Sequence, residues 1–168
     1  MKVLAALLLV MALAGCTSAV EPEQTALPAP SATAVAGLLP ATGPELTEAE
    51  ATAEGTRLAD ALQALIDGIL NVDDNSQLVP GDAETAAYYG VFRTISLEAA
   101  ADPLIMGAQL SSILEQSGWT LYETTNDDGQ FLAALSSGET GWFALVGGDA
   151  TVEGQSVVTF QIASPDLP

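Results

Sequence analysis

The segment DPLIMGAQLSSILEQSGW, at residues 102–119, contains the start and end signals of a helix. It predicts a helix over residues 103–117, because Asp102 occupies the N-cap position and Pro103 the first helical position. The apolar side chains of this helix recur at three and four spacing: Met106, Leu110, Ile113 and Leu114. The pattern therefore indicates an amphipathic helix with one apolar stripe.

Gly118 and Trp119 mark the end of this predicted helix. Gly118 stands at the C′ position, which commonly adopts a positive φ that glycine tolerates. In a Schellman cap the next residue, Trp119, can fold back onto Leu114. We expect this junction to hold the fold together, with Trp119 buried.

Four segments with strand-like patterns follow the helix. The first three are predicted to form an antiparallel meander and the fourth a last strand: 119–125, 130–137, 142–146 and 155–163. Asn126–Gly129 is a hairpin turn signal between the first two segments. The Gly-rich stretch 147–154 is expected to be a loop.

Two elements are predicted before the central helix. Residues 86–95 are rich in aromatic and β-branched side chains, which favours a strand. Thr47 and Glu50 form a capping box at the start of a predicted helix over 46–70. Residues 71–76 are predicted to be a turn-rich break. The order helix, strand, helix and three-stranded meander favours an α+β fold, with the helices on one face of a small antiparallel sheet.

Residues 17–44 differ from the rest of the chain, because they hold five of its nine prolines and no aromatic residue. This composition is typical of an extended, flexible tether. We therefore predict three parts: a signal peptide over 1–15, a lipidated cysteine and tether over 16–44, and an α+β domain over 45–168.

The first residues carry a targeting signal. Lys2 precedes an apolar run over 3–14, which is shorter than the roughly 20 residues that a membrane span needs. Such a run is typical of a secretory signal peptide. It ends in LAGC at residues 13–16, which resembles the lipobox of bacterial lipoproteins. The resemblance implies lipidation of Cys16 and localisation on the cell membrane or the outer membrane, facing the extracytoplasmic side. The alternative is an ordinary signal peptide followed by an incidental cysteine.

A second resemblance covers residues 79–163. A Pro80-Gly81 turn, a strand, a helix that ends in Gly118-Trp119 and three further strands are similar to a module that recurs in uncharacterised bacterial lipoproteins. This resemblance implies no activity.

The charge of the chain excludes one class of partner. The chain has 3 basic and 22 acidic residues, a formal net charge of −19. Removal of the signal peptide would leave Arg57 and Arg93 as the only cationic side chains. Such a chain repels nucleic acids and anionic lipid headgroups, because neutralising phosphates requires Lys and Arg. We therefore expect no nucleic-acid partner and a membrane attachment through lipid alone.

The residue types present also narrow the chemistry. The chain has no histidine and a single cysteine, the predicted lipid acceptor. A serine–histidine triad, a His- or Cys-ligated metal and lysine chemistry are therefore not expected in the mature chain. A carboxylate-dependent hydrolase stays open as an alternative, but it needs two acids that face each other across a cleft. We assign no catalytic residue, no cofactor and no metal ligand.

Two acidic clusters are candidate calcium-binding sites. Asp73-Asp74-Asn75 and Asn126–Gly129 supply the oxygen atoms that calcium prefers. Neither cluster matches the twelve-residue calcium loop with its final glutamate. The alternative interpretations are a solvated linker for the first cluster and a hairpin turn for the second.

Two pairs of adjacent aromatic residues are the candidate partner surface: Tyr88 with Tyr89, and Trp142 with Phe143. On a strand, one member of each pair faces the core and the other faces away. An outward aromatic side chain can bind a partner or stack on a glycan, although a helix often covers it instead. The sequence thus favours a non-catalytic, lipid-anchored envelope protein that binds a protein or polysaccharide. The alternative is an accessory lipoprotein that binds a solute or calcium.

Overall fold

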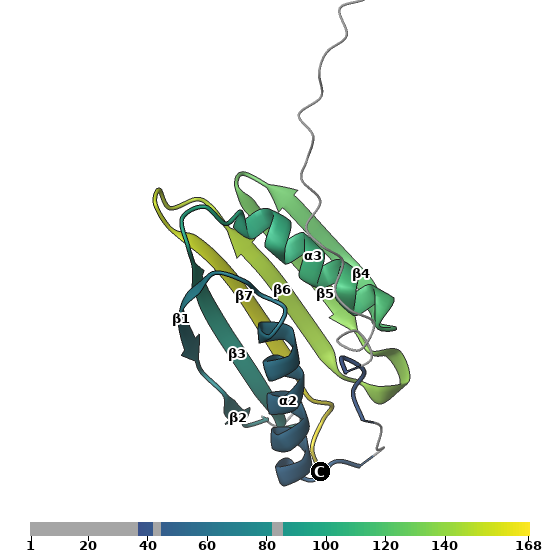
Figure 1. Ribbon diagram of the computed structural model, residues 1–168. Coiled ribbons are helices and arrows are strands. Elements are labelled where there is room, and N and C mark those ends of the chain that lie inside the picture. Colours follow the sequence, from purple (N-terminus) through teal and green to yellow (C-terminus); the bar gives the residue numbers. More distant parts are fainter. Residues whose placement is uncertain (1–36, 42–44, 82–85) are drawn as a thin grey trace, which may run out of the picture.

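The computed structural model describes residues 37–41, 45–81 and 86–168 (Figure 1). The elements in these ranges are, in chain order, α2 (Glu48–Gln63), β1 (Ile69–Asp74), β2 (Gln77–Val79), β3 (Tyr88–Leu97), α3 (Pro103–Gln116), β4 (Thr120–Asp127), β5 (Gln130–Ser136), the short 3-10 helix η1 (Gly138–Thr140), β6 (Phe143–Asp149) and β7 (Ser156–Ala163). The predicted α+β class is confirmed. The predicted signal peptide, Cys16 and residues 17–36 and 42–44 of the predicted tether lie outside the described residues.

The strands in the described ranges form one seven-stranded sheet, and every pairing within it is antiparallel. The strand order is β1-β3-β7-β6-β5-β4, and β2 pairs with β3 beyond the end of β1. The predicted three-stranded meander is wrong, because β4, β5, β6 and β7 form a continuous meander of consecutive neighbours. The last strand then pairs with β3 on its other side, which joins the two halves of the sheet.

Both helices cover the same face of the sheet (Figure 1). Helix α2 packs over β3 and β7, and α3 packs over β5 and β6. The core lies between the helices and this face of the sheet. Its fully buried strand residues include Val91, Ile95, Leu135, Val146, Phe160 and Ile162.

The predicted ends of α3 are confirmed. The carboxylate of Asp102 accepts hydrogen bonds from the N–H groups of Leu104 and Ile105. At the other end Gly118 has a φ of 98°, and its N–H donates to the carbonyl of Glu115. The Trp119 N–H donates to the Leu114 carbonyl, which completes a Schellman motif. Trp119 is 3% exposed and belongs to the core, as expected.

The glycines of β6 explain an error in the predicted loop. Gly147 and Gly148 belong to the strand, whereas the sequence pattern predicted a loop over 147–154. A Cβ at Gly148 would lie 2.0 Å from the carbonyl oxygen of Pro103. The first turn of α3 therefore packs directly on the backbone of β6, and only glycine leaves room for this approach.

The capping box of α2 is confirmed, but the predicted length of the helix is wrong. The Thr47 hydroxyl accepts from the Glu50 N–H, and the Glu50 carboxylate accepts from the Thr47 N–H. The helix ends at Gln63, and residues predicted as its last turn and as a turn-rich break form β1. Gly68, with a φ of 69°, lies between the two elements. Pairing with β3, a partner distant in sequence, overrides the local helical pattern of this segment.

The predicted start of the folded domain also needs correction, because residues 37–41 pack on it. Leu38 is fully buried, and its carbonyl accepts a hydrogen bond of 2.9 Å from Nε1 of Trp119. The Arg57 guanidinium on α2 donates to the carbonyls of Gly37 and Leu39. Both sets of contacts lie on the side of the helices. The sequence pattern missed them because one apolar residue in a Pro-rich segment carries no periodic signal.

Candidate functional site

The face of the sheet turned away from α2 and α3 is the candidate site, and no described helix or strand covers it (Figure 1). We call it the open face. Its members follow from strand alternation and register: Asp73 on β1, Tyr88, Phe92 and Thr94 on β3, Val157, Thr159 and Gln161 on β7, Phe143, Leu145 and Asp149 on β6, Leu132 and Ala134 on β5, and Glu123, Thr125 and Asp127 on β4.

Three large apolar side chains of the open face are exposed to solvent. Leu132 is 49% exposed, Phe92 is 40% exposed and Phe143 is 36% exposed. They come from β5, β3 and β6, and the half-buried Leu145 on β6 lies among these strands. Apolar groups that gather on one surface, with polar groups around them, mark interaction sites more often than scattered ones do.

The four predicted partner residues divide between the two faces. Tyr89 is 9% exposed and Trp142 is 1% exposed, and both belong to the core under the helices. Neither side chain can therefore contact a partner while the domain is folded. Tyr88 and Phe143 lie on the open face, Tyr88 half-buried and Phe143 exposed. The alternation expected of adjacent residues on a strand is therefore present in both pairs.

The sequence interpretation missed two residues of the site. Phe92 is two positions from Gly90 on the same side of β3, and Leu132 alternates with the buried Phe131 on β5. Strict period-two alternation could have placed both on one face. It could not have shown that this face has no covering helix, because that depends on where α2 and α3 pack.

The cationic side chains of the described residues lie on the other side of the sheet. Arg93 is 6% exposed, and its guanidinium contacts Asp74 and Asp60 at 2.8 Å each beneath α2. The pKa of Asp74 is raised by burial, but hydrogen bonds from Ser76 and Arg93 and the charge of Arg93 outweigh this and hold it below its ordinary value. Asp74 therefore forms an ion pair with Arg93 that is part of the fold.

Carboxylates, in contrast, lie around the open face. Asp73 lies at one edge of the sheet, and Glu123 and Asp127 lie at the opposite edge. Asp149 lies at the end of β6, where hydrogen bonds from the hydroxyl and the N–H of Thr151 lower the pKa of its carboxyl. The open face therefore combines an apolar centre with a negatively charged surround.

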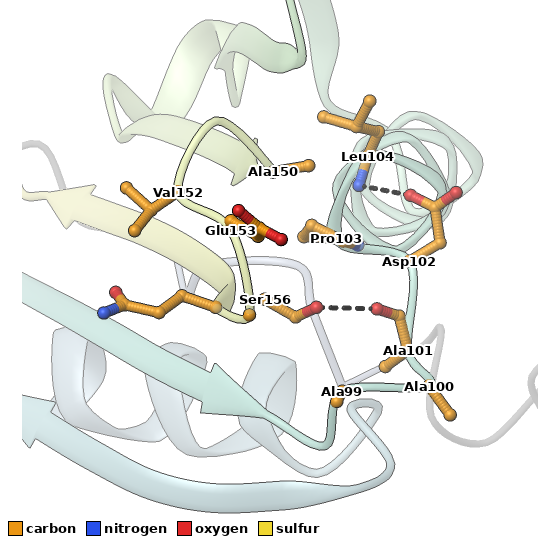
Figure 2. Close-up of a pocket in the computed structure, with 12 residues that line it drawn as sticks. Ala99, Ala100, Ala101, Asp102, Pro103, Leu104, Ala150, Val152, Glu153 and Ser156 are labelled. Atoms are coloured by element: carbon orange, nitrogen blue, oxygen red, sulfur yellow. Dashed lines mark hydrogen bonds between the residues drawn. The ribbon is translucent and has the colours of Figure 1, made fainter.

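A second feature is a cleft of about 420 Å³ between the start of α3 and the β6–β7 loop (Figure 2). Its polar side chains are largely committed to the fold. The Asp102 carboxylate caps α3, and the Ser156 hydroxyl donates to the Ala101 carbonyl at 2.9 Å. Glu153 is the other acid that lines the cleft. The Ser156–Ala101 bond joins the two sides of the cleft, and the Asp102 carboxylate is engaged by the N–H groups of its own helix.

The two candidate calcium clusters occupy different settings. Asp74 of the first is paired with Arg93. In the second, Asp128 and Gly129 have φ values of 49° and 79°, which are typical of a type I′ hairpin turn between β4 and β5. Within the described ranges, no group of three or more Asp, Glu, His or Cys side chains is placed to hold a metal ion.

No protein-family model matches the chain, and no curated protein matches it. Among the helices that the structure describes, none is both long enough and apolar enough to cross a membrane. The assignment of function therefore depends on the residues of this chain.

Proposed function

We propose that this chain is a lipid-anchored, non-catalytic protein of the cell envelope that binds a protein or polysaccharide partner through the open face. The observation that supports the proposal is the exposure of Phe92, Leu132 and Phe143 on the face of the sheet opposite the one on which both helices pack. Burying such side chains against a partner would remove apolar surface from water, which stabilises a complex by about 25 cal/mol per Å² of apolar surface buried.

The proposed anchor is a lipid on Cys16, on the cell membrane or the outer membrane. The LAGC sequence at residues 13–16 supports it, and so does the net charge of −19, which opposes attachment to anionic headgroups. Two or three acyl chains would anchor the protein firmly, because each buried CH₂ contributes about 0.8 kcal/mol.

Growth with radiolabelled fatty acid tests the anchor. The wild-type protein should incorporate the label and fractionate with membranes, and the Cys16→Ser variant should do neither. Normal labelling of the variant would contradict lipidation at this residue.

Photo-crosslinking in intact cells tests the binding role of the open face. A photoreactive amino acid at position 92 or 143 should give a discrete crosslinked product. The matched control is position 105 on α3, because Ile105 is similarly exposed, at 43%, but lies on the opposite side of the molecule. Equal products from position 105, or none from the open face, would contradict the proposal.

The alternatives, a solute- or calcium-binding accessory protein and a carboxylate hydrolase, would need polar groups that converge on a ligand. The cleft in Figure 2 is the natural place for them, and its groups Asp102 and Ser156 bond to the chain itself. These functions therefore lack a specific supporting contact in the described residues.

A further inference from the structure

We infer that the open face takes a basic polypeptide surface with an apolar centre, an inference that rests on the proposed function. The proposal commits to a protein partner rich in Lys or Arg. It depends on the register of the strands, on the placement of charge on the two sides of the sheet and on the size of the face.

The register places Leu145 in the middle of the face, with Phe92 and Leu132 each one strand in from an edge and Phe143 in the row at one end. The central row, from β3 to β4, contains Phe92, Gln161, Leu145, Ala134 and Glu123. Leu132 lies in the adjacent row, opposite Thr125 on β4 and Gly147 on β6. Phe143 lies in the row on the other side, opposite Ser136. An apolar centre inside a polar rim is the usual anatomy of a protein–protein interface.

The charged groups of the face lie outside this centre, on both edges of the sheet and at one end. Glu123 and Asp127 on β4 are exposed, as is Asp73 on β1. Asp127 pairs in register with Gln130, which in turn pairs with Asp149. The rim is thus negative on three sides, and a partner must bring positive charge to each of them.

The described arginines cannot neutralise this rim. Arg93 lies under α2 with Asp60 and Asp74, and Arg57 is bonded to Glu54 on α2 itself. Both side chains are therefore on the far side of the sheet from Glu123 and Asp127. Charge complementarity, which steers encounter and selects partners, then favours a basic surface and opposes an acidic one.

The dimensions of the face fit a protein partner. Six adjacent strands at about 4.8 Å spacing, of six to ten residues at about 3.3 Å per residue, give roughly 700 Å² in projection. A stable interface buries about 800 Å² on each partner. A basic polypeptide places opposite charges beside the carboxylates of the rim, an attraction that a neutral glycan does not supply.

The point where the described chain begins also leaves this face accessible. Residues 37–41 contact Arg57 on α2 and Trp119 at the end of α3, both on the covered side. Residues 37–41 therefore lie on the side of the domain away from the open face. A partner can approach the open face without displacing that segment.

Two synthetic peptides of equal length and equal apolar content provide the probes, one with Lys and one with Glu at its charged positions. Binding of each to the full protein in a non-ionic detergent is measured by fluorescence anisotropy at low and high salt. We expect the Lys peptide to bind, and its affinity to fall as salt screens the rim charges. The Glu peptide should bind at least tenfold more weakly.

Matched variants locate the binding. Phe92→Thr and the double variant Glu123→Lys/Asp127→Lys should each weaken binding of the Lys peptide at least tenfold. Ile105→Thr is the apolar control. Glu115→Lys/Glu153→Lys is the charge control, because it changes the net charge by the same amount away from the open face. Both controls should stay within twofold of wild type, and circular dichroism checks that all variants fold.

Each contrary result has a distinct meaning. If the wild-type protein does not bind the Lys peptide, or the control variants lose binding as Phe92→Thr does, the inference is overturned. If the protein instead binds a neutral β-linked glucose hexasaccharide in a manner that depends on Phe92, the basic-polypeptide inference fails while a partner-binding face remains. Absence of any crosslink at positions 92 and 143 in cells would overturn the proposed function itself.

Discussion

The two faces of the sheet are built from the same strands, yet their apolar residues have opposite environments. Leu135 and Leu132 lie three positions apart on β5; the first is fully buried under the helices and the second is 49% exposed. On β6, Val146 is fully buried, while Phe143 on the other face is 36% exposed. Alternation assigns residues to faces, but the helices decide which face becomes the core.

This comparison separates the residues that stabilise the fold from those that we propose bind a partner. The covered face is tightly packed, to the point that a Cβ cannot be added at Gly148 without meeting the Pro103 carbonyl. The open face keeps exposed phenylalanine and leucine without a described partner in the chain. Its residues should therefore affect stability little, and binding strongly.

The largest loss of stability is expected from Trp119→Ala, on the covered side. Trp119 is 3% exposed, completes the Schellman motif of α3 and donates to the Leu38 carbonyl. Truncation of a buried tryptophan typically costs about 3–5 kcal/mol, a large part of the roughly 5–15 kcal/mol that a domain has. Thermal unfolding followed by circular dichroism should show a sharply lower melting temperature.

Tyr122→Ala is the matched aromatic control for that variant, because Tyr122 is 73% exposed at a bulge in β4. It should leave the melting temperature nearly unchanged. Equal stability of wild type and Trp119→Ala would refute the structural role of Trp119.

A somewhat smaller loss is expected from Leu38→Ala, about 2–5 kcal/mol, because Leu38 is fully buried in the core. Its neighbour Leu39 is 53% exposed, so Leu39→Ala should change the free energy of unfolding by less than about 0.5 kcal/mol. Chemical denaturation of both variants measures the difference. If both substitutions had equally small effects, residues 37–41 would belong to the tether and not to the folded domain.

Replacing a glycine by alanine on each face tests how much room that face leaves for an added Cβ. Gly148→Ala should destabilise by about 1–3 kcal/mol, since its Cβ would force α3 away from β6. Gly90 lies on β3, where a Cβ would meet its nearest atom, in Tyr88, at an ordinary 3.5 Å. Gly90→Ala should be tolerated. Denaturant midpoints measure the stability of both variants. Equal midpoints for Gly148→Ala and Gly90→Ala would contradict this expectation.

Much of the fold was predictable because local signals and tertiary packing agree there. The N-cap at Asp102 and the Gly118-Trp119 junction carry local hydrogen bonds, so residue type alone located both ends of α3. Local signals failed for β1, because residues 69–70 continue a helical pattern and residues 71–74 have the composition of a turn, yet the whole segment pairs with β3. They also failed for Gly147 and Gly148, whose role is a close approach between elements distant in sequence.

The candidate site was predictable only in part for a related reason. The alternation of Tyr88 with Tyr89 and of Trp142 with Phe143 is a local property of a strand, and it placed one member of each pair outward. Phe92 and Leu132 obey the same rule but were not singled out. Their exposure depends on the position of both helices, which no short sequence pattern specifies.

A smaller, pH-dependent effect is expected at Glu54, which joins α2 to residues 37–41. A hydrogen bond from Arg57 lowers the pKa of Glu54 from its ordinary value of 4.5; burial opposes this shift, and the Ala41 N–H and the charge of Arg57 add to it. A lowered pKa in the folded state adds stability above pH 4.5, and that stability is lost as the pH falls through the lowered value.

The Glu54→Gln variant should therefore melt below wild type at neutral pH, and the two melting curves should converge as the pH falls below 4.5. Arg57→Gln should remove the same pH-dependent part. A difference in melting temperature that stays constant from pH 7 to pH 3 would contradict the linkage.

The smallest effect on stability is expected at Leu132, and it is the most direct test of the difference between the faces. Threonine is β-branched and suits a strand, so Leu132→Thr removes exposed apolar surface with little loss of strand propensity. The free energy of unfolding should change by less than about 0.5 kcal/mol, since no core contact is lost. The same substitution at Leu135 buries a hydroxyl and leaves a cavity, and should cost several-fold more. Denaturant titrations of the two variants compare the two faces of the same strand, β5. If Leu132→Thr were as destabilising as Leu135→Thr, both faces would be core, and the open face would belong to the fold and not to a partner.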